Sequence, residues 1–267
     1  MAAPLTDTGS QDTTSMRGTA DRAPVVELLG LPGAGKSTIA ASLVAGLRAS
    51  NMDVLTTEDF VAWLAARSRL EKIGILVRSL PRALLKLWRA LLFASSLRPF
   101  GSCPMVRVAL IPFLTYCFDR YLHLHKHSVV VMDQANMQLV WSMGAYAASY
   151  QAPTLERLCC ATRGQTPRLY AFIAVSPDVV AERIRQRPSN LSRFDRESEF
   201  VLRGALKASA MLMDDIARFL VWNDEKVMVL DATASIESNA QALLEAVCAT
   251  LEEQAEHPSY PDGCKPC

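Results

Sequence analysis

The run at residues 30–37 places the strongest constraint on what this chain can fold into. It reads Gly-Leu-Pro-Gly-Ala-Gly-Lys-Ser, and it lies between an apolar segment and a segment whose apolar residues recur at helical spacing. In phosphate-binding loops of this pattern, glycines let successive backbone N–H groups point toward phosphate oxygens. The run therefore predicts a strand, a tight loop and a helix at the start of an α/β domain.

The residues of this glycine loop have separable expected roles. We expect the Lys36 ammonium to contact the terminal phosphates of a nucleoside triphosphate and the Ser37 hydroxyl to bind Mg²⁺. The positive end of the helix that follows adds to the attraction for an anion. The alternative is a plain glycine-rich turn. The residues expected to bind the nucleotide are Gly30, Leu31, Pro32, Gly33, Ala34, Gly35, Lys36, Ser37 and Thr38.

The rest of the chain alternates short apolar runs with longer helical patterns, which is typical of a parallel sheet covered by helices. The predicted strands are residues 25–29, 53–57, 128–132, 169–175 and 227–230. The predicted helices are residues 36–50, 60–97 with a break near Pro81, 106–125, 177–187, 200–220 and 235–253. We expect one domain over residues 24–254, with a flexible leader at 1–23 and a flexible tail at 255–267.

Composition excludes several classes of protein. The 267 residues are 50% hydrophobic and 21% charged, which excludes a disordered tail protein, a collagen-like fibre and a disulfide-stapled small protein. The net charge of +1 argues against a nucleic-acid-binding protein. The 7 cysteines lack a framework spacing and no secretory signal precedes them, so we expect a cytoplasmic protein. Charges and prolines interrupt the apolar stretch 84–118, so no membrane span or membrane partner is expected.

Asp133 directly follows the predicted strand 128–132. A carboxylate at the carboxyl end of a strand beside a phosphate loop can hold Mg²⁺ or orient an acceptor hydroxyl. Gln134 stands where hydrolytic ATPases carry a glutamate that polarises water, which favours transfer to a bound acceptor over hydrolysis. The alternative for Asp133 is a solvated strand-end residue or a helix N-cap.

Three arginines follow the fourth predicted strand. Arg183 and Arg187 are four residues apart and share one helix face, and Arg193 lies in the Pro/Ser/Asn-containing segment after them. Guanidinium groups carried by a closing loop would stabilise charge on a transferring phosphoryl group and exclude water. The pattern predicts an arginine-bearing lid over residues 183–200; the alternative is a solvated arginine-rich helix.

With these pieces in order, the chain resembles the P-loop nucleoside and nucleotide kinases, in particular thymidylate-kinase-like proteins, over residues 24–254. The resemblance implies a three-layer α/β/α P-loop NTPase fold with a five-stranded parallel sheet, a helical acceptor-side region at 60–127 and the lid. It also implies that the lid arginines contact ATP phosphates and that the strand end at residues 229–232 lies beside the adenine. Glu58 or Asp59 is the nearest match to the family's acidic residue after the second strand. Glu58 would bind or deprotonate an acceptor hydroxyl; equally, it could be a helix-start carboxylate.

The resemblance implies an ATP-dependent phosphotransferase that acts on a small-molecule acceptor such as a nucleotide or nucleoside, with ATP and Mg²⁺ as cofactors. The chain has Gln134 where the family carries an arginine after the aspartate, and it lacks the family's Arg-Glu-Pro-Gly run after the second strand. The apolar insert 60–118 leaves room for a larger or less polar acceptor. The alternative is a regulatory ATPase whose output is a protein complex, and a homodimer is left open. The predicted catalytic residues are Lys36, Asp133, Arg183, Arg187, Arg193 and Glu58, and the predicted metal ligands are Ser37 and Asp133.

Three weaker patterns involve the histidines, the last two cysteines and the tryptophans. The alternating histidines and the terminal Cys-x-x-Cys lack the partner ligands of a zinc site. For the tryptophans we favour core packing over a role in lining the acceptor site. These residues are His123, His125, His127, Cys264, Cys267, Trp63, Trp88 and Trp141.

Overall fold

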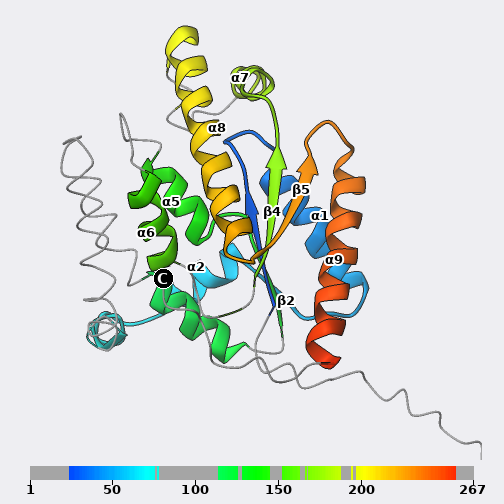
Figure 1. Ribbon diagram of the computed structural model, residues 1–267. Coiled ribbons are helices and arrows are strands. Elements are labelled where there is room, and N and C mark those ends of the chain that lie inside the picture. The colour runs from blue at the N-terminus through cyan, green and yellow to red at the C-terminus, as the bar shows by residue number, and fades with distance from the viewer. Residues whose placement is uncertain are drawn as a thin grey trace, which may run out of the picture.

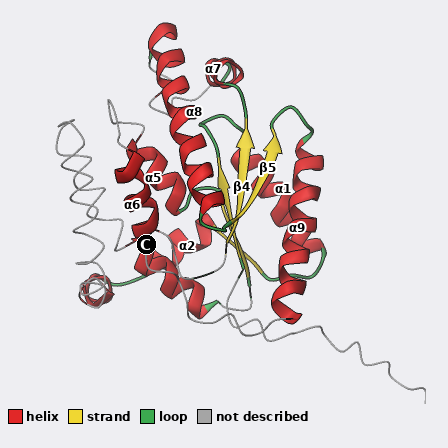
Figure 2. Cartoon of the chain, viewed as in Figure 1, coloured by secondary structure: helices red, strands yellow, loops and turns green. Residues whose placement is uncertain are grey.

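The computed structural model describes residues 24–75, 77, 114–125, 128–144, 152–162, 166, 168–187, 194 and 197–256. These residues form an α/β fold in which helices flank a sheet of five parallel strands (Figures 1 and 2). The strand order is β2-β3-β1-β4-β5. The predicted leader 1–23, the tail after residue 256 and most of the insert 60–118 lie outside the described residues. The strands are β1 (Val25–Leu29), β2 (Val54–Thr56), β3 (Val129–Met132), β4 (Arg168–Ala174) and β5 (Lys226–Asp231).

Helices cover both faces of this sheet. Helices α1 and α9 pack side by side on one face, and α5, α6 and α8 lie on the other (Figure 1). Unlabelled helical turns also occur at residues 69–75 and 114–124. The helices are α1 (Lys36–Ala49), α2 (Thr57–Ala65), α5 (Asn136–Gly144), α6 (Ala152–Thr162), α7 (Pro177–Arg185), α8 (Glu199–Trp222) and α9 (Ile236–Glu256).

The central strand β1 is buried on both of its faces. Val26 and Leu28 belong to the core cluster that includes α1 and α9, whereas Val25 and Leu29 belong to the clusters on the opposite face. Strands buried on both faces read as continuous apolar runs rather than as an alternating pattern. This is why the short apolar segments of the sequence predict the buried strands β1, β3 and β4, whereas β2 and β5 at the two edges of the sheet are more exposed.

Glu27 is the exception in this apolar strand, because its side chain is fully buried. Its carboxylate pairs with the Arg168 guanidinium at 3.0 Å and accepts a hydrogen bond of 2.6 Å from the backbone N–H of Met137. Burial raises the pKa of Glu27, and the charge of Arg168 opposes this shift. Glu27 therefore links β1 to β4 and also to the N-terminus of α5.

Helices α5 and α6 were not predicted from the sequence. For α5 the structure gives a physical reason. The first N–H groups of a helix need acceptors, and the acceptor for Met137 comes from Glu27, which is 110 residues away along the chain. A local capping pattern is thus replaced by a tertiary contact, which the sequence around residue 136 does not reveal.

We expect Arg168→Met to lower the free energy of unfolding by about 3–5 kcal/mol, because it leaves the Glu27 charge buried without its partner. Without Arg168 the pKa of Glu27 rises further, so the variant keeps more of its stability at low pH and loses it as pH increases through that pKa. Denaturant unfolding at pH 5 and pH 8 measures both effects. The control is Arg218→Met, which removes an exposed pair with Asp215. If Arg168→Met lowers the free energy of unfolding by the same amount at pH 5 and at pH 8, this interpretation is wrong.

Candidate functional site

The candidate site lies where β1, β2 and β3 end. The glycine loop follows β1, Thr57 follows β2 and Asp133 follows β3, and the three strands are parallel neighbours. Helix α1 leaves β1 toward one face of the sheet, whereas α5 leaves β3 toward the other. A crevice forms at such a point in open α/β sheets, because the two connections diverge there.

The glycine loop has a positive φ that favours glycine at three positions, the first being Gly30 with a φ of 155°. Gly33 has a φ of 88° and Gly35 a φ of 99°, a left-handed region that residues with a Cβ rarely adopt. A hydrogen bond of 3.1 Å from the Ala34 N–H to the Leu31 carbonyl closes the turn over residues 31–34. Among the described residues, none accepts a hydrogen bond from the N–H groups of Gly33, Gly35, Lys36 or Ser37. These donors remain available to an anion.

The Lys36 side chain folds back onto this loop. Its Nζ donates hydrogen bonds of 2.7 Å to the Gly30 carbonyl and 3.0 Å to the Leu31 carbonyl. Burial lowers the pKa of Lys36 to about 8; the carboxylate of Asp133 opposes the shift, and the nearby charge of Arg187 adds to it. The structure thus brings Lys36, Asp133 and Arg187 close together, as the sequence predicts for a phosphate site.

Asp133 accepts hydrogen bonds on both carboxylate oxygens. The Ser37 hydroxyl donates to Oδ2 at 2.7 Å, and the Thr57 hydroxyl donates to Oδ1 at 2.9 Å. The backbone N–H of Asp133 in turn donates to Thr57 Oγ1 at 3.2 Å. The two predicted metal ligands therefore contact each other, and Thr57 joins them although the sequence did not predict it.

The sequence placed Thr57 in a strand and began the next helix at Phe60, and both boundaries are wrong. Strand β2 ends at Thr56, whose side chain and Asp59 form a capping box, so that α2 begins at Thr57. A Thr-x-x-Asp spacing is close to the known capping-box pattern, and it is the signal that would have found this boundary. Glu58 lies in the first turn of α2 with its side chain exposed, while the capping role belongs to Asp59.

The predicted arginines have different surroundings. Arg183 donates hydrogen bonds to the carbonyl of Ala232 at 3.1 Å and of Gly33 at 3.4 Å, so it bridges the glycine loop and the end of β5. Arg187 is exposed, and its Nη2 lies 3.7 Å from the position that a Cβ on Gly33 would occupy. Arg193 lies outside the described residues. Two of the three predicted cations are thus beside the loop.

Helix α7, which carries Arg183, is held against α8 by charged side chains. Arg185 pairs with Glu199 at 2.8 Å, and Arg203 pairs with both Glu199 and Asp178. Ser176 caps the start of α7 by accepting a hydrogen bond from the Val179 N–H. Exposed pairs of this kind contribute little stability individually, but here they fix the direction of one short helix.

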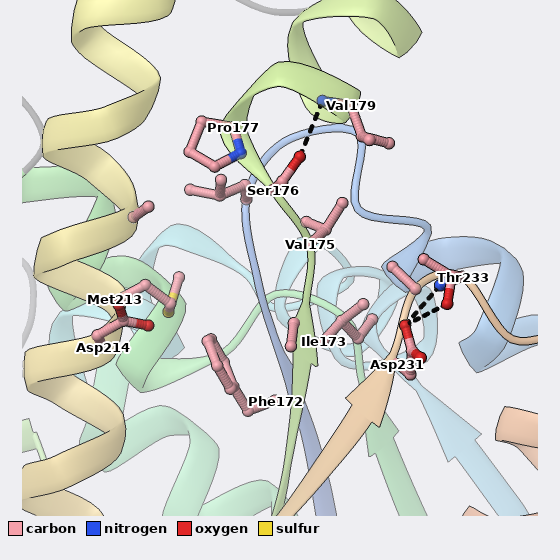
Figure 3. Close-up of a pocket in the computed structure, with 14 residues that line it drawn as sticks. Phe172, Ile173, Val175, Ser176, Pro177, Val179, Met213, Asp214, Asp231 and Thr233 are labelled. Atoms are coloured by element: carbon pink, nitrogen blue, oxygen red, sulfur yellow. Dashed lines mark hydrogen bonds between the residues drawn. The ribbon is translucent and has the colours of Figure 1, made fainter.

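A cavity of about 470 Å³ lies beside the loop, between α8 and the ends of β4 and β5 (Figure 3). Leu31 of the glycine loop and the apolar side chains of Phe172 and Met213 line it, with Asp214 and Asp231 also in its wall. Asp231 accepts hydrogen bonds of 2.8 Å from both the N–H and the hydroxyl of Thr233, which lower its pKa. Partial burial raises the pKa of Asp214. The cavity is mostly apolar with a few polar groups, which is typical of ligand pockets.

The weaker sequence patterns show no comparable arrangement. Trp141 is buried and its indole N–H donates to the Ser209 carbonyl, which confirms its core role. Trp63 packs against Phe60 and the Tyr121 ring, which also contacts His125. Among the described residues, no group of three or more His, Cys, Asp or Glu side chains could hold a metal ion, and no helix is long and apolar enough to cross a membrane. Trp88, His127, Cys264 and Cys267 lie outside the described residues.

Comparisons with known proteins add no family to this description. No family model matches the chain, and no curated protein matches it significantly. The assignment of a function therefore rests on the residues and geometry described above.

The lowered pKa of Lys36 predicts a pH dependence of stability in the absence of ligand. Between pH 8 and the ordinary pKa of 10.5, the unfolded chain binds a proton at Lys36 that the folded protein has lost. We therefore expect the free energy of unfolding of the wild type to rise, relative to Lys36→Met, as pH increases from 7 to 10. Denaturant unfolding across this range measures the difference. The control Lys207→Met, at an exposed position on α8, should show no such trend. If the difference in unfolding free energy between the wild type and Lys36→Met does not change with pH, the prediction is wrong.

Proposed function

We propose that this protein is an ATP-dependent phosphotransferase of the P-loop kinase type, which transfers the terminal phosphoryl group to a small-molecule acceptor. The observation that carries the proposal is the arrangement at the glycine loop. Available N–H groups, Lys36 and Arg187 lie together there, beside an Asp133 that is hydrogen-bonded to Ser37. A polyphosphate presents several oxygens to such a set of donors and cations at once.

The same residues fit a magnesium ion. The Ser37 hydroxyl and the Asp133 carboxylate are oxygen ligands, and Mg²⁺ binds proteins through one or two such groups together with phosphate oxygens and water. When bound, Mg²⁺ neutralises charge that develops on the phosphates. Lys36 and Arg187 contribute the remaining positive charge on the protein side. Ser37 and Asp133 would hold the ion at the edge of the sheet where the loop begins α1.

The cavity beside Leu31 supports a purine nucleotide as the ligand. It lies at the carboxyl ends of β4 and β5, next to the glycine loop. The bonds from Arg183 to Gly33 and Ala232 hold the loop and the end of β5 at a fixed separation. We propose that the base occupies this cavity while the phosphates contact the loop, which leaves Arg183 as a brace between the two subsites.

Phosphoryl transfer from such a complex needs an acceptor hydroxyl and a base. The acceptor oxygen forms a bond to the terminal phosphorus as the bond from phosphorus to the bridging oxygen breaks, and ADP leaves. The acceptor proton passes to Glu58 or to Asp133. Glu58 is exposed in the first turn of α2, next to Thr57. The part of the proposed lid between α7 and α8, which includes Arg193, would exclude water from this step.

We expect the purified protein to release ADP from Mg·ATP appreciably only when a suitable hydroxylated acceptor is present. A coupled assay across nucleosides, nucleotides and small hydroxylated metabolites measures this. Lys36→Ala should abolish the activity, and Asp133→Asn should lower kcat by about 100-fold or more, because each removes charge stabilisation at the phosphates. Fast hydrolysis without an acceptor would contradict the proposal. A regulatory ATPase would give a different result. It would bind the nucleotide tightly, turn it over slowly with every acceptor, and bind a partner protein in only one nucleotide state.

The proposed base subsite has its own test. Ala210 lines the cavity on α8, so Ala210→Phe should weaken ATP binding by about tenfold or more, since an added ring fills space that the base needs. Binding of inorganic tripolyphosphate should be unchanged, because it needs the loop alone. Calorimetric titration measures both ligands. Ala208→Phe is the matched control, at an exposed position on the same helix. Unchanged ATP binding would place the base elsewhere, and equal weakening of both ligands would show that the substitution disturbs the loop rather than the base subsite.

A further inference from the structure

Thr57 is the residue of this site whose role the proposed function leaves unexplained. We infer that Thr57 is a positioning residue: its hydroxyl holds Asp133 in the orientation in which Asp133 and Ser37 bind Mg²⁺, and thereby sets the Mg²⁺ dependence of nucleotide binding. The inference rests on the proposed function, because it assumes that a nucleotide binds at the glycine loop. The inference goes beyond the proposed function because it assigns a role to a residue that supports the metal site without touching the metal.

The backbone brings Thr57 to Asp133 by strand register. Thr56 pairs with Val131 across β2 and β3, so Thr57 lies level with Met132, the residue directly before Asp133. The capping box between Thr56 and Asp59 then turns the chain into α2 directly at Thr57. Its hydroxyl therefore projects from a position that is fixed by a sheet on one side and by a helix start on the other.

The Thr57 hydroxyl makes two bonds to Asp133, which together need a group that is both a donor and an acceptor, and its oxygen also lies 3.8 Å from the sulfur of Met132, a weak acceptor. It donates to Oδ1 of Asp133 at 2.9 Å and accepts from the Asp133 backbone N–H at 3.2 Å. Side chain and main chain of Asp133 are both fixed in this way. The second oxygen, Oδ2, is left for Ser37 at 2.7 Å. Without the Thr57 hydroxyl, the carboxylate would be free to rotate away from Ser37.

This arrangement also connects the two halves of the proposed active site. Thr57 is the first residue of α2 and Glu58 is the second. The same hydroxyl that orients Asp133 on the metal side therefore anchors the helix start that carries the proposed acceptor-side carboxylate. The acceptor side and the nucleotide side share one hydrogen-bonded contact, Thr57 to Asp133.

The test compares Thr57→Val, which keeps the shape and removes the hydroxyl, with Thr57→Ser, which keeps the hydroxyl. Binding of a fluorescent ATP analogue is measured with Mg²⁺ titrated from chelator to saturation, and thermal unfolding confirms that each variant folds. We expect Thr57→Val to need about tenfold more Mg²⁺ for half-maximal binding, the effect of one hydrogen bond to a charged group. Binding in chelator should be unchanged, and Thr57→Ser should stay within about threefold of the wild type. Thr250→Val, which removes a hydroxyl from α9, is the matched control.

The outcomes separate this inference from the proposed function. If the wild type binds no nucleotide, the proposed function fails and the role of Thr57 fails with it. If the wild type binds and Thr57→Val shows the same Mg²⁺ dependence, only the role of Thr57 is overturned. Equal impairment in the Val and Ser variants would also overturn it, because packing rather than the hydroxyl would then be responsible. If Thr57→Val does not fold, Thr57→Ala removes the hydroxyl with the same expected result.

Discussion

The parallel pairing of β1 with β3 is the contact on which the rest of the site depends. Glu27 pairs with Met132 across these strands, so the residues that follow each strand reach the same edge of the sheet. The hydroxyl of Ser37 can then donate to Asp133 at 2.7 Å, although 96 residues separate them in the chain. Because α1 and α5 leave toward opposite faces, the two connections diverge beside these side chains.

A second constraint lies beneath this edge, in the buried pair of Glu27 and Arg168. An isolated charge is costly to bury, and here each member is the partner that the other needs. The Glu27 carboxylate also accepts a hydrogen bond from the start of α5, the helix that follows Asp133. The strand that leads into the glycine loop and the helix that follows Asp133 are therefore held together from inside the core as well as at the surface.

Two of the cations at the site are held in place by hydrogen bonds to backbone carbonyl oxygens. Lys36 and Arg183 both donate to carbonyl oxygens of the glycine loop, which keeps each of them in place before any ligand arrives. Such preorganisation lowers the cost of binding, because the groups need not be ordered again. Asp133 is also held in place before a ligand binds, because the hydroxyls of Ser37 and Thr57 donate hydrogen bonds to its two carboxylate oxygens. The site thus presents a fixed set of donors and cations around one carboxylate.

The sequence by itself determined the features whose causes are local. Apolar runs specify the buried strands β1, β3 and β4, and the positive φ of Gly33 and Gly35 needs glycine, so these strands, the loop and the helix after it follow from short segments. Only the tertiary structure decided which polar groups meet. Thr57 reaches Asp133 across 76 residues and Glu27 caps α5 across 110, and no local pattern encodes such distances. They arise because parallel pairing aligns strand ends that the chain order keeps apart.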